Sequence, residues 1–185
     1  MARKIVILVG IYLEGIYPRG ENSVEANLLA PATLKASADA DSEIVEKYEI
    51  EILNLPASLS NEDVAQMILG EEPVAVGFSA YVWNMDLIAK TAQLVRSLNP
   101  DIITFVGGPE VTYSAIEVLD AHSQFDFIVT GSGEERFKKI LRNDLRPEVQ
   151  PQIPGITYRN TDGNAVEIEV AIPVPEDLSK VPSPY

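Results

Sequence analysis

The sequence predicts a doubly wound α/β fold, flavodoxin-like or Rossmann-like, with a mostly parallel five-stranded sheet. Short apolar runs typical of buried parallel strands alternate along the chain with stretches of helical periodicity. Three of these runs end in small residues, at 77–80, 107–110 and 131–134. The carboxyl ends of parallel strands form one edge of an open sheet, and ligands bind at that edge. We therefore expect the three junctions to lie together around a ligand site.

The first strand is expected at residues 5–9, a compact apolar run typical of a central strand. A long loop follows at 10–21, and its length and glycine content indicate a functional or mobile segment. Asn22 and Glu25 resemble a capping box, which predicts the start of a helix. Pro31 is expected to kink this helix or to lie in its first turns.

The next part of the chain shows two strand patterns and one short helix. Residues 44–53 alternate apolar and charged side chains, which predicts a strand near the sheet edge. Ser60 or Asn61 is expected to cap a short helix that ends at Gly70. A further strand is expected at 74–79.

The clearest helical pattern begins at Asn84 and stops at Asn99-Pro100. Strands are then expected at 102–106 and 127–129, alternating with helices at 112–122 and 134–141. This alternation of strands and helices predicts right-handed crossovers between parallel strands.

The character of the chain changes beyond Arg142. Strand patterns at 156–159 and 166–170 flank Asp162-Gly163, a turn signature of a β-hairpin. Prolines recur from residue 173 onward, as in a linker. The expected organisation is an α/β domain at 1–145, a β-hairpin appendage at 146–172 and a linker at 173–185.

Composition excludes several classes of function. The 185 residues are 46% hydrophobic, which is enough for one good core. The net charge of -14 repels nucleic acid and anionic membranes, so neither is expected as a partner. No apolar stretch is long enough to span a bilayer, and a cytoplasmic location is expected. The absence of cysteine excludes disulfides, thiolate catalysis and a cysteine-ligated cluster, and a single histidine, His122, predicts no metal site.

The small residues at the junctions leave room for a ligand against the backbone. A Cβ at Gly107 or Gly108 would collide with such a ligand, and amides at the start of the next helix can donate hydrogen bonds to it. Ser79 adds a hydroxyl that can bond a polar group of the ligand. We expect a flat or extended ligand that lies across the strand ends.

The spacing of Ser79 and Gly107-Gly108 is similar to two motifs of the cobalamin-binding domain family. In that family the serine and the glycine pair line the slot that holds the nucleotide tail of the cofactor. Gly-Ser-Gly-Glu at 131–134 resembles the Gly-x-Gly-Glu junction of domains that precede a radical SAM core. Gly-Gly-Pro-Glu at 107–110 and the segment 177–185 resemble the same subgroup, which includes several methyltransferases and the anaerobic magnesium-protoporphyrin ester cyclase type.

This resemblance implies the cofactor-binding domain of a cobalamin-dependent radical SAM enzyme that performs methyl transfer or oxidative cyclisation. The implied partners are the corrinoid cofactor and a C-terminal radical SAM domain, and only that domain would hold S-adenosylmethionine and a 4Fe-4S cluster. No catalytic residue is implied in this chain. The residues implied to bind the cofactor lie at the strand ends: Gly10, Tyr12, Ser79, Ala80, Tyr81, Gly107, Gly108, Pro109, Glu110, Gly131, Ser132, Gly133 and Glu134.

The chain departs from the family pattern in three places. Residues 10–15 read Gly-Ile-Tyr-Leu-Glu-Gly where enzymes with an axial histidine have Asp-x-His-x-x-Gly, so the implied cobalamin has no histidine lower ligand. Tyr81 stands where the wider family often has leucine, which could alter the slot. The cluster-binding Cys-x-x-x-Cys-x-x-Cys is absent, so we expect a domain of a longer enzyme that is not catalytic alone.

Two other functions stay open. The same fold could act without a cofactor as a structural or interaction domain, which the missing histidine favours. It could also be a stand-alone nucleotide-binding or flavin-binding α/β protein, although no Gly-x-Gly-x-x-Gly follows the first strand.

The candidate residues also have purely structural interpretations. The glycine pair could only permit a tight turn between a strand and a helix. Glu110 and Glu134 could be charges at helix starts, and Tyr12, Tyr17, Tyr81 and Trp83 could cover the core.

Overall fold

The computed structural model describes residues 2–14, 29–146, 153–168 and 182–183. A seven-stranded sheet in the order β2-β1-β3-β4-β5-β6-β7 runs through its centre. Its parallel part consists of β1 (Lys4–Tyr12), β2 (Tyr48–Pro56), β3 (Ala75–Ser79), β4 (Ile103–Gly107) and β5 (Phe127–Val129). Two antiparallel strands, β6 (Ile156–Arg159) and β7 (Ala165–Glu167), follow. The predicted α/β fold with a mostly parallel sheet is confirmed.

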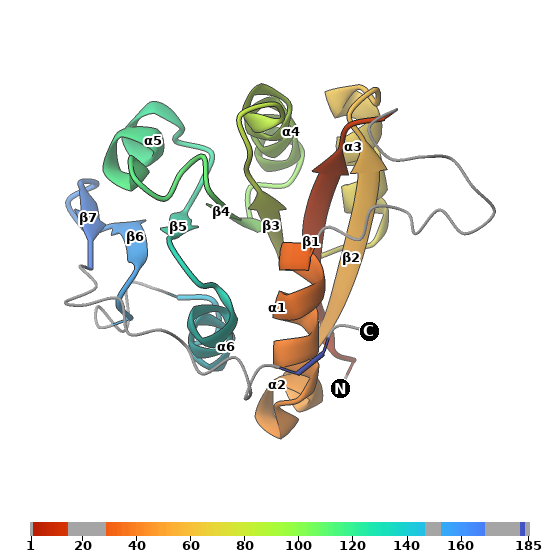
Figure 1. Ribbon diagram of the computed structural model, residues 1–185, viewed down its shortest axis with the longest axis vertical. Coiled ribbons are helices and arrows are strands. Elements are labelled where there is room, and N and C mark those ends of the chain that lie inside the picture. The colour runs from red at the N-terminus through yellow and green to blue at the C-terminus, as the bar shows by residue number, and fades with distance from the viewer. Residues whose placement is uncertain (1, 15–28, 147–152, 169–181, 184–185) are drawn as a thin grey trace.

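The number of strands corrects the prediction, because the sheet has seven strands and not five. The strands of the expected hairpin pair with the sheet itself: Ile156 of β6 lies opposite Val129 of β5, and Tyr158 lies opposite Phe127. Strand β5 has only three residues, and β6 covers the edge that would otherwise stay unpaired. The hairpin therefore continues the sheet at its blue end in Figure 1.

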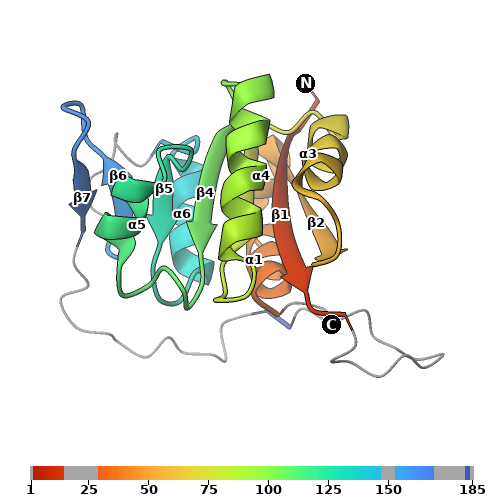
Figure 2. The same cartoon turned by 90° about the horizontal axis from the view of Figure 1, so that it is seen from above.

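Helices cover both faces of the sheet, as Figures 1 and 2 show. One face packs against α1 (Leu29–Asp39), α2 (Ser42–Lys47) and α6 (Glu134–Arg142), and the other against α3 (Asn61–Gly70), α4 (Met85–Leu98) and α5 (Ala115–Ala121). Alternate strand residues serve the two faces: Leu8 belongs to the core cluster that includes Phe137 of α6, and Val9 to the cluster that includes Ile88 of α4. The sheet is thus buried on both sides, as expected for parallel strands.

The expected strand at 44–53 is wrong in its first part. Residues 42–47 form helix α2, because the Asp41 side chain accepts hydrogen bonds from the backbone N–H groups of Glu43 (3.2 Å) and Ile44 (3.4 Å) and so caps a helix. Strand β2 begins only at Tyr48, and it lies at the sheet edge as predicted.

Other element ends agree with the sequence more closely. The hydroxyl of Ser60 accepts from the backbone N–H of Asp63 (3.1 Å) and caps α3, as predicted. Pro31 lies in the first turn of α1 as described, whereas the capping box at Asn22 and Glu25 lies outside the described residues. The helix expected at 112–122 is shorter, since α5 begins after Ser114.

In the part of the chain that the structure describes, no helix is both long enough and apolar enough to cross a membrane.

Candidate functional site

A cavity of about 440 Å³ opens at the carboxyl edge of the sheet, on the face covered by α1 and α6. Strands β1, β3, β4 and β5 contribute its floor, which includes Leu8, Gly77, Phe105 and Val129. One wall comes from α1, through residues such as Leu34, and the opposite wall from α6. Its volume falls in the range of small-molecule and cofactor sites, about 300–1,000 Å³.

Aromatic rings form the floor of the cavity. The ring of Phe105 lies across Gly77, where a Cβ would come within 2.3 Å of the ring carbon Cζ. Phe105 in turn stacks on Phe127, with ring centroids 5.0 Å apart, and contacts Phe137 of α6 at 6.0 Å. The missing side chain at Gly77 therefore leaves the space that the Phe105 ring occupies.

The first junction, between β3 and α4, is held by Asn84. This side chain is almost completely buried; its Nδ2 donates to the carbonyl of Ser79 (2.9 Å), and its Oδ1 accepts from the backbone N–H of Tyr81 (2.8 Å). Ser79 lines the cavity, and its hydroxyl makes no hydrogen bond to any described residue. The Tyr81 ring, which belongs to the lining, stacks on Trp83, which does not, with ring centroids 4.5 Å apart.

The second junction, between β4 and α5, packs directly against the first. Gly108 has φ +117°, and a Cβ there would lie 2.5 Å from the carbonyl oxygen of Ala80. The backbone N–H of Ala80 donates to the carbonyl of Gly107 (2.7 Å). Close approach of two backbones thus requires glycine at 108. Gly108 therefore has a structural role and also lines the cavity.

The third junction, between β5 and α6, contacts α1 directly. A Cβ at Gly133 would lie 2.9 Å from the Cδ2 of Leu34, so glycine allows α1 to come close. Gly131 has φ +66°, a left-handed conformation that suits glycine. Glu134 lies in the first turn of α6 and lines the same wall.

The structure brings together most, but not all, of the predicted residues. Nine of the thirteen line the cavity: Ser79, Tyr81, Gly107, Gly108, Pro109, Gly131, Ser132, Gly133 and Glu134. Ala80 and Glu110 lie in the junctions outside the lining, while Gly10 and Tyr12 pair with Asn54 and Pro56 of β2. Tyr17 lies outside the described residues.

Sequence reasoning missed Asn84 and Tyr113 as contributors to the site. The pattern around Asn84 predicts only a helix start, although its side chain bonds back into the junction. Tyr113 lines the cavity with 96% of its surface exposed, and nothing in the sequence pattern around it points to a ligand.

The lining is poor in ionisable groups. Among the described residues that form it, Glu134 is the one carboxylate and no basic side chain is present. No group of three or more His, Cys, Asp and Glu residues that could hold a metal ion occurs in the described part. The arrangement suits binding of a largely apolar, flat group better than acid–base chemistry.

Comparison with known proteins gives the family. A family model described as B12 binding domain matches residues 39–141, more than half of the chain. The cobalamin-dependent radical SAM methyltransferase TokK of Streptomyces tokunonensis is 29% identical over 92% of this chain and 24% of its own length. The anaerobic magnesium-protoporphyrin IX monomethyl ester cyclase of Rubrivivax gelatinosus is 29% identical over 66% of this chain and 22% of its own length.

A solved structure has the same fold. The cobalamin-dependent S-adenosylmethionine radical enzyme OxsB, with aqua-cobalamin and S-adenosylmethionine bound, superposes with a TM-score of 0.66 at 16% identity over 92% of this chain and 23% of that protein. The chain spans about a quarter of the length of the curated relatives and solved structures that it matches.

Proposed function

The chain belongs to the B12 binding domain family, and we therefore propose that it binds cobalamin in the cavity between α1 and α6. The observation that carries the proposal is the position of this cavity. It opens at the carboxyl edge where Ser79 and the Gly107-Gly108 pair meet, and these are the residues that resemble the family motifs.

The residues present fit such a group. The Phe105 ring offers an apolar floor against which a flat heteroaromatic tail can pack. Gly77 has no side chain and so leaves space for this ring. The Ser79 hydroxyl has no hydrogen-bond partner among described residues and can bond a polar edge of the tail. Bound cobalamin would supply a corrin-held cobalt for methyl transfer or oxidative cyclisation.

We expect no histidine from this chain below the cobalt. The single histidine, His122, follows α5 at the opposite end of the sheet, where its Nδ1 lies 3.3 Å from Nε2 of Gln124 and its ring meets Phe125 edge-on. Residues 10–14 contain none either. The chain's own role would be to bind and orient the cofactor.

We also propose that the domain works with a C-terminal radical SAM domain. Such a domain would hold S-adenosylmethionine and a 4Fe-4S cluster and would make the complete protein a methyltransferase or an oxidative cyclase, in line with the names of the relatives. The absence of an acid–base pair from the described lining supports a binding role for the present chain.

Titration with hydroxocobalamin tests the proposal. Trp83 is the single tryptophan and stacks on Tyr81 of the cavity lining, so cobalamin binding is expected to quench its fluorescence and to leave cobalamin absorbance with the protein after gel filtration. Parallel titrations with flavin mononucleotide and NADH are expected to give no saturable signal. Folded protein that retains no cobalamin contradicts the proposal, and saturable flavin or NADH binding would favour the stand-alone alternative.

A further inference from the structure

We propose that Arg136, together with the segment 153–156 that leads into the hairpin, positions the third junction for cobalamin. This inference rests on the proposed function and adds a region outside the matched family domain, which ends at residue 141. Neither Arg136 nor Gly155 lines the cavity, so their effect would pass through the residues of the junction.

The Arg136 side chain bridges the junction and the segment 153–156. Its Nε donates to the carbonyl of Pro154 (2.7 Å), and its Nη1 donates to the carbonyl of Ser132. Ser132 lines the cavity between two glycines, whose backbones have few steric restrictions of their own. The guanidinium therefore holds a segment that would otherwise sample many conformations.

A second pair of hydrogen bonds ties the end of β5 to the same segment. Thr130 is buried, and both its backbone N–H (2.8 Å) and its hydroxyl (3.1 Å) donate to the carbonyl of Gly155. Gly155 in turn donates its N–H to the carbonyl of Ile168, just beyond β7 (2.8 Å). The chain of contacts runs from the cavity wall to the hairpin.

The conformation of Gly155 is part of the arrangement. Its φ is +82°, and a Cβ would lie 2.4 Å from the Nε of Arg136. Glycine is therefore needed for the arginine to lie against the backbone and reach Pro154. An added methyl group would push the guanidinium away from both carbonyls.

Substitution of Arg136 tests the inference in the full 185-residue chain. Arg136→Ala is expected to weaken hydroxocobalamin binding by about tenfold, the scale of one lost charge-assisted hydrogen bond. Arg136→Lys keeps one donor and is expected to recover part of that loss. Binding is measured by Trp83 fluorescence well below the unfolding temperature, so that a change in stability alone does not alter the result.

Arg159→Ala is the matched control. Arg159 also anchors the hairpin, through the carbonyl of Leu119 and an ion pair with Asp120 (3.7 Å), but it attaches to α5 and not to the third junction. We expect it to lower the unfolding temperature and to leave cobalamin affinity within about twofold of wild type. Equal affinity of wild type and Arg136→Ala, or an equal loss in Arg159→Ala, would overturn the inference while leaving the proposed function intact.

Hydrogen exchange on the unsubstituted chain gives a test that does not depend on the folding of a variant. The amides of Thr130 and Gly155 do not line the cavity, yet they should exchange more slowly when cobalamin is bound because the junction and the segment 153–156 are ordered together. Protection confined to cavity residues would refute the coupling. A wild-type chain without any cobalamin binding would refute both this inference and the proposed function.

Discussion

Gly77 and Phe105 together determine the depth of the cavity. Phe105 cannot move away easily, because it packs between Phe127 and Phe137 in the core. Gly77→Ala is therefore expected to lower the free energy of unfolding by about 1–3 kcal/mol, the usual cost of overpacking, and to weaken cobalamin binding. Urea unfolding and fluorescence titration measure the two effects.

Gly70→Ala is the control for this substitution. Gly70 lies in the last turn of α3, and beyond the backbone of that helix and the two neighbouring residues no described residue has an atom within 4 Å of the position that an added Cβ would take. Alanine is therefore expected to be neutral or slightly stabilising there. A Gly77→Ala protein as stable as wild type would show that Phe105 is free to move.

Asn84 is expected to be the most sensitive polar residue near the site. Asn84→Ala leaves the carbonyl of Ser79 and the N–H of Tyr81 without their partner in a buried place, at a cost of about 2 kcal/mol in unfolding free energy. Cobalamin affinity should fall as well, because Ser79 and Tyr81 both line the cavity. Chemical denaturation and cobalamin titration provide the measurements.

Asn99→Ala serves as the comparison for Asn84. The Asn99 side chain accepts one hydrogen bond, from the backbone N–H of Asp101 (3.2 Å), in an exposed turn. It should change stability by less than about 1 kcal/mol and leave cobalamin binding unchanged. Similar losses of stability in both variants would indicate that the buried hydrogen bonds of Asn84 contribute no more than the exposed one of Asn99.

The sequence predicts the small residues of the site better than the side chains that hold them. Gly108 and Ser79 can be predicted because small residues directly after an apolar run indicate a tight turn or a ligand site at the end of a strand. Asn84 has the appearance of an ordinary helix cap, yet it makes no capping bond and points back into the junction. The direction of the Asn84 side chain depends on the position of the Ser79 carbonyl in the folded structure. The spacing of residues along the chain does not specify that position.

Among the helices and strands, sequence patterns locate the buried strands well and the edges poorly. All five residues of strand β3 are buried, and its predicted start is within one residue of the observed one because both its faces are covered. Residues 44–47 carry an alternating pattern that suits a strand. The Asp41 side chain caps a helix there instead, and α2 is too short to show a helical pattern in the sequence. The strand pattern of 156–159 is visible in the sequence, whereas its pairing with β5 is a long-range contact that local patterns do not specify.

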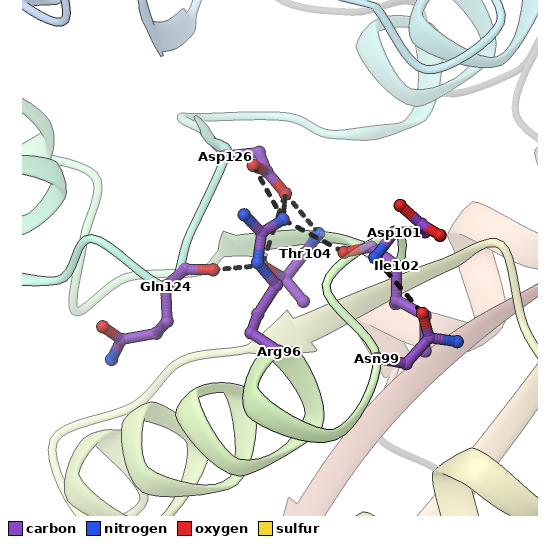
Figure 3. A network of polar contacts seen from close by, with 7 residues as sticks. All are labelled: Arg96, Asn99, Asp101, Ile102, Thr104, Gln124 and Asp126. Atoms are coloured by element: carbon purple, nitrogen blue, oxygen red, sulfur yellow. Dashed lines mark hydrogen bonds and ion pairs between the residues drawn. The ribbon is translucent and has the colours of Figure 1, made fainter.

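A polar network joins α4, β4 and the start of β5, as Figure 3 shows. It lies near the amino ends of β4 and β5, whereas the cavity opens at the carboxyl edge of the sheet. Arg96 donates to both carboxylate oxygens of Asp126 (3.0 and 2.8 Å) and to the carbonyl of Ile102 (3.1 Å). Asp126 also accepts from the backbone N–H of Thr104 (2.8 Å). The network satisfies backbone groups of the connections at this edge.

Asp126 should make stability depend on pH. Burial raises the pKa of its carboxyl above the ordinary value of 3.8, although Thr104 and Arg96 act in the opposite direction. The folded protein then binds the proton more tightly than the unfolded chain, so this group's contribution to stability falls as pH rises from about 3.8 through the raised pKa. Asp126→Asn is expected to remove that decline, which unfolding temperatures across this pH range would measure.

Asp101→Asn is the control, because Asp101 is an exposed carboxylate in the turn beside the network. Its substitution removes a neighbouring carboxylate without touching the contacts of Asp126, so the slope of stability against pH should change more in Asp126→Asn than in Asp101→Asn. An Asp126→Asn protein with an unchanged slope would mean that the proton is bound equally in the folded and unfolded states.

Over the molecule as a whole, the hairpin is part of the core as well as of the sheet. Ile153, Ile156 and Tyr158 are buried and belong to the same hydrophobic cluster as Phe127 and Val129 of β5. The cluster also includes residues of α1, α2 and α6, the helices that cover this face. A boundary at residue 145 would cut through that cluster.

Truncation tests whether the expected domain 1–145 is a folding unit. Loss of three buried apolar side chains removes about 5 kcal/mol of burial, comparable with the whole stability of a small domain, and leaves the edge of β5 unpaired. We expect the fragment 1–145 to aggregate or to unfold without a cooperative transition, by gel filtration and circular dichroism. The fragment 1–168, which retains both hairpin strands, is the comparison and should unfold cooperatively. A monomeric, cooperative 1–145 would show that the hairpin is an independent appendage. Because this fragment lacks the contacts of Arg136 and Thr130 with Pro154 and Gly155, it would then be expected to bind cobalamin more weakly than the longer fragment does.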